Sequence, residues 1–482
     1  MGLMAGLLGV GLSAFCLWHG LVIAWRCWAL RKLEYVNLSF WTMAYIFIYE
    51  DAESLITWLL STRLTFHERK MVLLNPFNVA PYVLLNGARQ VEPLLKSKNI
   101  TKSREYDAMK PWLGDGLIAS SGEYWRKQRR ILTPTFHYEI LHNYVAIFAT
   151  HGQSLVKRIA GLTSGGPAEV NIWPLFNCCT LDAICEAVIG RHFDLQNKGT
   201  SDYAQAICKV TRIARERMQQ PWFWNDAVFS LTRAGREQKA CLQLIHGFGA
   251  QASSKRKMAF LELLSDLHEQ GVLTEDEIRV ELDNFIFAGH DTTTMGLTWA
   301  LFLLGHHPEE QRKCQAEIDA FIQSPSDYTM DNLKNLVYLE ACFKEALRLY
   351  PPVPLMGRIL EEPLKVDDDV VLPSGTTVGF FTYTVHRDKE FWPDAESFRP
   401  QRFLPENVLN RHPFSYIPFS AGSRNCIGQR FAILEAKTLL SMILQRFHCK
   451  SLQERHELPP VAELVLRPPA PVNLRLIPRT HS

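Results

Sequence analysis

The sequence predicts a mainly α-helical protein with a smaller β-rich part towards its carboxyl end and an apolar helix at its amino end. Apolar residues recur at helical spacing through the middle of the chain, and short alternating runs separated by turn residues follow Pro352. The first 25 residues are almost continuously apolar. With 482 residues, 47% of them hydrophobic, the chain can bury a large core.

Charge and cysteine content argue against several classes of protein. A net charge of +2 gives no support for nucleic-acid binding. The eleven cysteines are odd in number and include no C-x-x-C pair. This pattern argues against a disulfide framework and against a zinc site, and it fits a reducing compartment.

The amino end predicts a single membrane anchor within residues 1–34. The apolar run from Leu3 to Trp25 is long enough to cross a hydrocarbon core of ~30 Å. No basic residue precedes it, whereas Arg26, Arg31 and Lys32 follow, which predicts that the rest of the chain is cytosolic. A buried core helix is the alternative interpretation.

Residues 35–75 are expected to form a membrane-proximal linker, and residues 76–482 the catalytic domain. The apolar run from Leu38 to Tyr49 is too short to span a membrane, so it either lies in the interface or is buried. With this topology the sequons at Asn37 and Asn99 stay unglycosylated.

The rest of the chain can be divided in order into loops, helices and strands. In the first half we expect a strand and turn at 79–86, a loop at 111–121, a helix from 121, and helices within 140–260 with a break at 163–167 and a loop at 247–257. A long helix should run from the capping box at Thr274 to Gly305, and another helix should span 333–350. The strands are expected at 364–366, 370–372 and 376–381, with an edge strand at 472–477. The aromatic run Trp222-Phe223-Trp224 is expected to be part of the core, and a lipid-facing position is the alternative.

Cys426 is the residue with the clearest chemical role. It lies in the pattern F-x-x-G-x-R-x-C-x-G, which runs from Phe419 to Gly428 and opens an apolar helix. A cysteine at a helix amino end has a favoured thiolate, and Arg424 places a cation two residues away. A buried structural cysteine is the alternative, but a chance match to five fixed positions is on the order of one in ten thousand. The pattern predicts one thiolate presented to one metal.

Polar residues also interrupt the long apolar helix. Gly289, Asp291 and Thr292 are locally unfavourable there, which is typical of functional sites. We expect the helix to widen at Gly289 and leave room for a small molecule, Thr292 to hold water or dioxygen, and Asp291 to relay protons. A simple kink is the alternative, and His290 is expected to face solvent or to be paired rather than to act as a ligand.

Glu345 and Arg348 form an E-x-x-R pair on one helix face. Arg402 follows in an R-P-Q-R-F run and can join them in a three-charge cluster. Because burying such a cluster costs desolvation, its expected role is to fix geometry.

Taken in their order along the chain, these motifs resemble those of the cytochrome P450 haem-thiolate monooxygenases. The resemblance covers about 400 residues, from roughly 76 to 480. The stretches from Thr133 to His137 and around Phe419 are similar to family 4, whose members typically hydroxylate fatty acids at or near the terminal methyl. The resemblance implies that Cys426 is the axial ligand of haem b and that Asp291 and Thr292 deliver protons. It implies a cofactor-binding set of Trp125, Arg129, Arg358, Arg424, Phe419 and Gly428, with the first four at the propionates.

The resemblance also implies partners and an address. Electrons would come from an NADPH-dependent flavoprotein reductase, with cytochrome b5 as a second candidate partner, at the endoplasmic reticulum membrane. The basic residues Lys127, Arg130, Arg430 and Lys437 are candidates for the reductase surface, and a solvated face is the alternative.

The chain departs from the family 4 pattern in three places. Many members carry a glutamate esterified to the haem where this chain has Ala288, so non-covalent haem is expected. No Pro-rich hinge follows the anchor, and the loop at 247–258 is short.

The expected reaction is RH + O₂ + two electrons + two protons giving ROH and water. The expected pocket contains Phe285, Ala288, Val353, Leu355 and residues near Leu464. Alternatives are oxidation of steroid-like or xenobiotic substrates, an O₂-independent haem-thiolate isomerase or dehydratase, and a membrane-anchored haem gas sensor.

Overall fold

The computed structural model describes residues 30, 34–36, 71–74, 82–98, 100–198, 202–220, 223–250 and 259–479. The predicted anchor from Leu3 to Trp25, its basic flank at residues 26, 31 and 32, the run from Leu38 to Tyr49, and Asn37 and Asn99 lie outside these residues.

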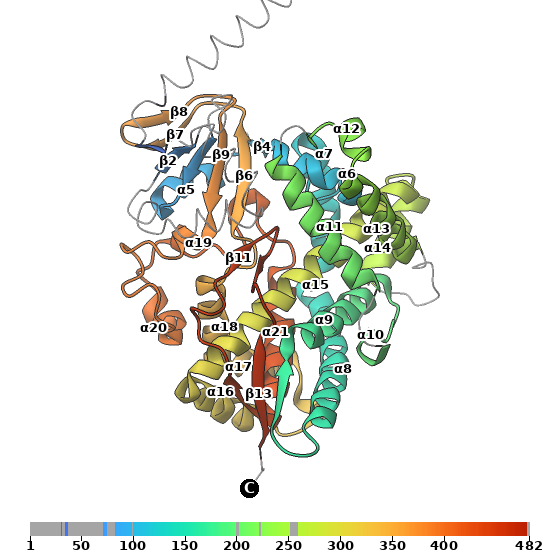
Figure 1. Ribbon diagram of the computed structural model, residues 1–482, viewed down its shortest axis with the longest axis vertical. Helices are drawn as coiled ribbons and strands as arrows, with labels where there is room; N and C mark the ends of the chain where they lie inside the picture. The colour runs from blue at the N-terminus through green and yellow to red at the C-terminus, as the bar shows by residue number, and fades with distance from the viewer. Residues whose placement is uncertain are drawn as a thin grey trace, which may run out of the picture.

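Most of the helices lie on one side of the molecule, the largest sheet lies at one end, and strands from the carboxyl end of the chain lie at the centre and at the opposite end (Figure 1). The longer helices are α5 (Ala88–Lys96), α7 (Gly122–Leu132), α8 (Tyr138–Leu162), α9 (Ile172–Ile189), α11 (Asp202–Gln219), α13 (Arg233–Ala250), α14 (Ala259–Glu269), α15 (Glu275–His306), α16 (Pro308–Phe321), α18 (Val337–Leu349) and α21 (Gln429–Arg446). Shorter helices are α6 (Lys110–Leu113), α10 (Leu195–Lys198), α12 (Asp226–Ser230), α17 (Met330–Asn335), α19 (Thr382–Val385) and α20 (Pro405–Val408), and the 3₁₀ turns include η3 (Thr133–Phe136), η6 (Pro400–Phe403) and η8 (Gly422–Arg424).

The long helix α15 crosses the middle of the molecule (Figure 1). The predicted capping box is present, since the Thr274 hydroxyl accepts from the Glu277 N–H and the Glu277 carboxylate accepts from the Thr274 N–H. Helix α9 packs along α15 and is itself apolar enough to cross a membrane, with a mean hydropathy of 1.4. Because 83% of α9 is buried inside the protein, it is a core helix here.

A six-stranded sheet lies at the β-rich end, in the order β1-β2-β3-β9-β6-β4. Its strands are β1 (Glu34–Val36), β2 (Met71–Leu74), β3 (Tyr82–Leu85), β9 (Thr377–Phe381), β6 (Leu355–Leu360) and β4 (Ile100–Lys102). The hairpin of β7 (Leu364–Asp367) and β8 (Val370–Leu372) has the predicted position. Strand β4 pairs antiparallel with β6 and sets Lys102 opposite Arg358, which matters for the site below.

Two smaller sheets lie near the carboxyl end. Strand β13 (Asn473–Pro478) pairs with both β10 (Phe447–Ser451) and β5 (Ala168–Asn171), and β11 (Val461–Ala462) pairs with β12 (Leu466–Arg467). The prediction of an edge strand at 472–477 was therefore wrong: β13 is the central strand of its sheet. Both of its partners are distant in sequence, so local pattern could not reveal them.

Three further predictions need correction. The helix expected at 333–350 is two helices that meet at Leu336, because the Glu317 carboxylate of α16 accepts the N–H groups of Tyr338 and Leu339 and caps α18 from outside. Helix α13 continues to Ala250, beyond the expected start of a loop at 247. Trp224 is 44% exposed rather than part of the core.

Candidate haem-thiolate site

The loop that carries Cys426 is closed by its own backbone. The Cys426 N–H donates to the Phe419 carbonyl over 2.8 Å, and η8 and α21 flank the loop. Gly422 has a φ of +70°, and a Cβ there would lie 1.8 Å from the Leu95 carbonyl of α5. Only glycine fits this close contact, so Gly422 allows the loop to pack against the end of α5.

Cys426 is the one exposed cysteine among the nine that the structure describes. Desolvation by the surrounding protein nevertheless raises the pKa of its thiol, while the Gly428 N–H and the Arg129 guanidinium act in the opposite direction. Both observations hold if the sulfur faces a recess of the protein rather than bulk water. The two donors are the groups that would stabilise a metal-bound thiolate there.

Helix α15 is buried from Glu281 to Leu304 except at Ala288, Gly289 and Thr292. These three residues, which we call the α15 strip, lie within one turn of each other; Ala288 and Thr292 share a face, and Gly289 lies beside them, turned towards α9. The Thr292 hydroxyl donates to the Ala288 carbonyl over 2.7 Å. The prediction that the helix widens at Gly289 was wrong, because α15 is continuous and Gly289 allows α9 to approach: a Cβ would lie 2.7 Å from Ile184.

Asp291 pairs with an arginine of the protein, whereas a proton relay would need its carboxylate to reach solvent. It is buried and accepts two hydrogen bonds from Nη2 of Arg467 in β12, at 2.7 and 2.8 Å. Arg467 in turn donates to Glu463 over 3.1 Å. His290 is buried rather than solvent-facing, and its Nδ1 donates to the Ile286 carbonyl over 2.9 Å, so of the two expected arrangements it has the paired one.

The four predicted rim residues gather near the cysteine loop. The Arg424 guanidinium stacks on Trp125 at 3.9 Å from the ring centroid. Arg129 donates to the main-chain carbonyl and side-chain oxygen of Asn425, at 2.9 and 2.8 Å. Arg358 is buried, and its Nε has no hydrogen-bond partner among the described residues.

Lys102 is a fifth rim residue that the sequence did not indicate. Burial, Arg358 and Arg424 hold the pKa of Lys102 well below its usual value. Burial and then Arg358 lower the pKa of Arg424 to about 9. These shifts mean that the cations repel one another inside the protein, which is the arrangement that a ligand with two carboxylates would relieve. Only the pairing of β4 with β6 brings Lys102 here, so no local signal could have found it.

Glu345 and Arg348 are fully buried and pair at 2.7 Å, and the Arg402 Nε lies 3.5 Å from the same carboxylate. Arg348 also donates to the carbonyls of His386, Ala395 and Ser397. This cluster joins α18 to the segment that precedes the cysteine loop.

The predicted pocket residues divide into two groups. Phe285 is buried and stacks on Phe136 at 5.5 Å, so it belongs to the core. Ala288, Val353 and Leu355 are half-buried.

The candidates for the reductase surface differ in their exposure. Lys437 is buried and pairs with Glu340 at 2.7 Å, so it is no longer a candidate. Lys127, Arg130 and Arg430 are exposed.

The residues present fit a haem. Cys426 is exposed while the surrounding protein raises the pKa of its thiol, the cations of Lys102, Arg358 and Arg424 lie close enough to act on one another, and α15 offers an accessible strip of small side chains. This combination defines the class of haem-thiolate proteins.

Comparison with known proteins gives the family. The model of the cytochrome P450 family matches residues 71–476, and the chain belongs to that family. It is 38% identical over 433 residues to cytochrome P450 4c3 of Drosophila melanogaster, covering 83% of this chain and 80% of the relative. It is 39% identical over 421 residues to cytochrome P450 4V2 of Homo sapiens, covering 80% and 78%, and 35% identical over 452 residues to cytochrome P450 4c21 of Blattella germanica, covering 89% of both. The protein is a haem-dependent monooxygenase that uses O₂ and a partner reductase.

Proposed function

We propose that this enzyme hydroxylates fatty acids at or near the terminal carbon. The observation that carries the substrate class is the α15 strip, which presents only a methyl group, a glycine and one hydroxyl in an otherwise buried helix. Such a surface suits an unactivated hydrocarbon chain better than a polar substrate, because it offers little to replace the hydrogen bonds that a polar group loses on leaving water. The family 4 relatives support this choice.

When bound, haem with a thiolate ligand supplies the activation of O₂. Cys426 would hold the iron, and Trp125, Arg129, Arg358, Arg424 and Lys102 would hold the two carboxylates of the haem. Thr292 would donate its hydroxyl proton towards the bound ligand after releasing the Ala288 carbonyl. Asp291 would serve proton delivery to Thr292 only after its carboxylate turns away from Arg467, which holds both of its oxygens in this structure.

The test is turnover by the full-length protein with an NADPH-dependent flavoprotein reductase, on saturated fatty acids of varied chain length. We expect hydroxylation at the last or next-to-last carbon, and a reduced carbon-monoxide spectrum typical of a thiolate ligand. Cys426→Ser should lose that spectrum, whereas Cys208→Ser, at a half-buried cysteine, should keep it. Turnover of steroid-like or xenobiotic substrates alone would replace the fatty-acid assignment, and product formation without reductase or O₂ would favour an isomerase or dehydratase.

We also propose that the haem is non-covalent, because Ala288 has no group that can form an ester. Acidified organic solvent should extract all haem from the wild-type protein after turnover. Ala288→Glu should retain a fraction of the haem on the chain, and Ala288→Gln is the matched control. Haem that stays attached to the wild-type protein would contradict the proposal.

Finally, we propose that residues 1–34 anchor the enzyme in the endoplasmic reticulum membrane with its catalytic domain in the cytosol. The full chain should remain with microsomal membranes during alkaline carbonate extraction. Release of the full chain by carbonate would contradict the anchor.

A further inference from the structure

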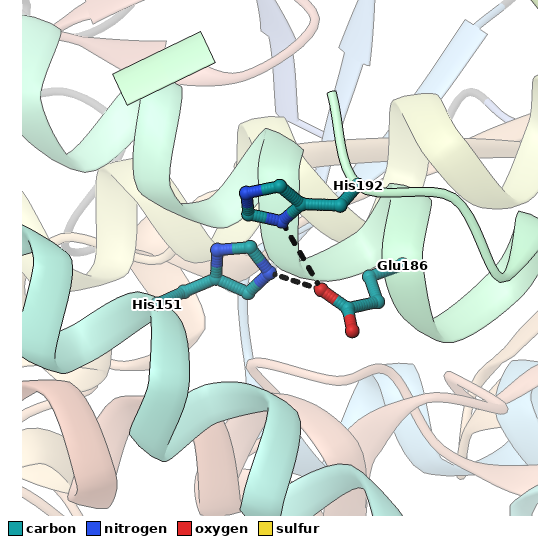
Figure 2. Close-up of side chains that lie close together, drawn as sticks. All are labelled: His151, Glu186 and His192. Atoms are coloured by element: carbon teal, nitrogen blue, oxygen red, sulfur yellow. Dashed lines mark hydrogen bonds and ion pairs between the residues drawn. The ribbon is translucent and has the colours of Figure 1, made fainter. Parts of the chain in front are cut away.

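Two histidines and a glutamate converge at the surface where α8, α9 and the connection to α10 meet (Figure 2). The Glu186 Oε2 lies 2.9 Å from Nε2 of His151 and 3.4 Å from Nδ1 of His192. One ligand atom from each residue lies within 4.8 Å of the other two. No residue of this trio belongs to the haem site.

We propose that His151, Glu186 and His192 bind a divalent transition-metal ion, with Zn²⁺ as the ion that suits this ligand set best. Two imidazoles and one carboxylate are typical zinc ligands, and three protein ligands leave a fourth position for water. Around a tetrahedral Zn²⁺ the ligand atoms lie roughly 3.3 Å apart, as follows from Zn–N and Zn–O distances of about 2.0–2.1 Å. The observed separations of 2.9 and 3.4 Å are close to this value.

The backbone builds this arrangement. Helix α9 ends at Gly190, whose φ of +73° turns the chain while its N–H donates to the Glu186 carbonyl. The turn brings His192 back over Glu186, so that its ring stacks on the His151 ring at 5.1 Å. The His151 carbonyl accepts from Nε2 of Gln196, which fixes the connection to α8.

The two rings also show how an ion would be taken up. They are nearly parallel, with 19° between their planes, so one must rotate to direct its lone pair at the ion. The His192 side chain is 46% exposed and can rotate, whereas the His151 side chain is fully buried and fixed. The His151 Nδ1 is buried without a hydrogen-bond partner in the described chain, which leaves Nε2 as the nitrogen that faces the other ligands.

Negative charge around the trio favours a cation. Asp182, which accepts from the N–H groups of Leu195 and Gln196, acts electrostatically on both histidines. The Asp194 Oδ1 lies 3.9 Å from Nε2 of His192 and can orient that ring when Nδ1 binds an ion. A bound ion would tie α8, the end of α9 and the start of α10 together.

The test is Zn²⁺ binding by the haem-loaded, full-length protein after treatment with a chelator and dialysis. Competition with a chromogenic chelator should show one equivalent of Zn²⁺ bound at this site in the wild-type protein. His192→Ala and Glu186→Gln should each lose that equivalent or bind it at least tenfold more weakly. His456→Ala, at an exposed histidine outside the trio, should bind Zn²⁺ like the wild type.

Two further readouts separate this site from the cysteines. X-ray absorption at the zinc edge should show imidazole nitrogen and oxygen at ~2.0–2.1 Å, whereas sulfur at ~2.3 Å would indicate a cysteine site. Zn²⁺ should raise the melting temperature of the wild type and of His456→Ala but not that of His192→Ala. The carbon-monoxide spectrum verifies that each variant is folded, and Glu186→Gln replaces His192→Ala if the latter is not.

The proposal is overturned if the wild type binds no Zn²⁺, if the two trio variants bind it unchanged, or if the ligands are sulfur. In those cases the two imidazoles simply donate hydrogen bonds to Glu186. None of these results bears on the monooxygenase activity.

Discussion

At the scale of single residues, the haem site depends on charges that the protein does not neutralise by itself. Arg358 is 1% exposed, and its Nε finds no partner among the described residues. Its Nη1 donates only to the neutral Gly357 carbonyl, and a buried cation that is incompletely hydrogen-bonded is costly, so the free energy of binding a carboxylate there is favourable. Burying the Arg358 guanidinium destabilises the protein when no haem is bound. A haem carboxylate that pairs with this guanidinium would remove that penalty, and this gain contributes to the affinity for haem.

Arg358→Met should therefore release haem faster. Hydrogen bonds to charged groups contribute about 1.5–3 kcal/mol, which corresponds to roughly 10- to 100-fold faster transfer of haem to an acceptor apoprotein. Arg89→Ala, at an exposed arginine that pairs with Glu390, is the control and should leave the rate unchanged. Equal rates for Arg358→Met and the wild type would remove Arg358 from the rim.

Glu281 gives a prediction for pH dependence. Burial raises the pKa of this carboxyl from 4.5 to about 7, while the Leu117 N–H that donates to it acts in the opposite direction. Because the pKa in the folded state lies above the unfolded value, the contribution to stability is complete below pH 4.5 and is lost as the pH rises through 7. Glu281→Gln should thus be neutral near pH 4.5 and stabilising by about 2–3 kcal/mol at pH 8, as followed by denaturant unfolding.

Glu277, one turn earlier on α15, is the matched control. The Thr274 N–H lowers the pKa of Glu277, so Glu277→Gln should lose stability at pH 8 and not near pH 4. The two variants must therefore differ in sign at pH 8. The same sign for both would show that neither burial nor the capping box sets these pKa values.

At the scale of elements, α15 is held in position by contacts at two places, its first turn and its middle. Its first turn is capped from within, by Thr274 and Glu277, as the sequence predicts. Its middle is tied to β12 by the pair of Asp291 and Arg467, which no local pattern indicates. The side chains in the middle of the helix are thus oriented by an element 176 residues away.

Arg467→Leu should destabilise the protein by about 3–5 kcal/mol, because it leaves the buried Asp291 carboxylate without its partner. Removing both charges in Arg467→Leu with Asp291→Asn should restore part of that loss. Guanidinium unfolding, followed by the haem absorption band, measures four proteins: the wild type, the single variants Arg467→Leu and Asp291→Asn, and the double variant. A double variant that is as unstable as the sum of both single variants would show that the two residues are not coupled.

At the scale of the whole molecule, we propose the exposed basic residues around the cysteine loop as the surface that binds the reductase. Helix α7 lies against this loop through Arg129 and Asn425, so Arg130 at the end of α7 and Arg430 at the start of α21 are exposed near it. Charges on such a face mainly change the rate of association, and salt screens them.

Arg130→Glu and Arg430→Glu should each slow reductase-supported turnover several-fold at low ionic strength, and less at high ionic strength. Turnover supported by an organic hydroperoxide needs no partner and should not change. Lys239→Glu on α13 is the charge-matched control. Slowing of both reactions by the same factor would indicate damage to the site instead of the docking surface.

The sequence predicted well whatever depends on neighbouring residues. The capping box of α15 and the turn-separated strands β7, β8 and β9 follow from short patterns of residues. It failed where a distant element supplies the hydrogen bonds. The start of α18 depends on Glu317, and β13 lies between two strands from other parts of the chain.

The sequence by itself indicated Cys426 as the metal ligand, because the cysteine, its glycines and its arginine lie within ten residues. It also determined the family, through motifs in a fixed order. Only the tertiary structure decided which charges are buried together: Lys102 with Arg358, Asp291 with Arg467, and His151 with Glu186 and His192. The physical reason is that the energy of a charge depends on its desolvation and on its partners in space, and both are set by elements that the chain brings together only on folding.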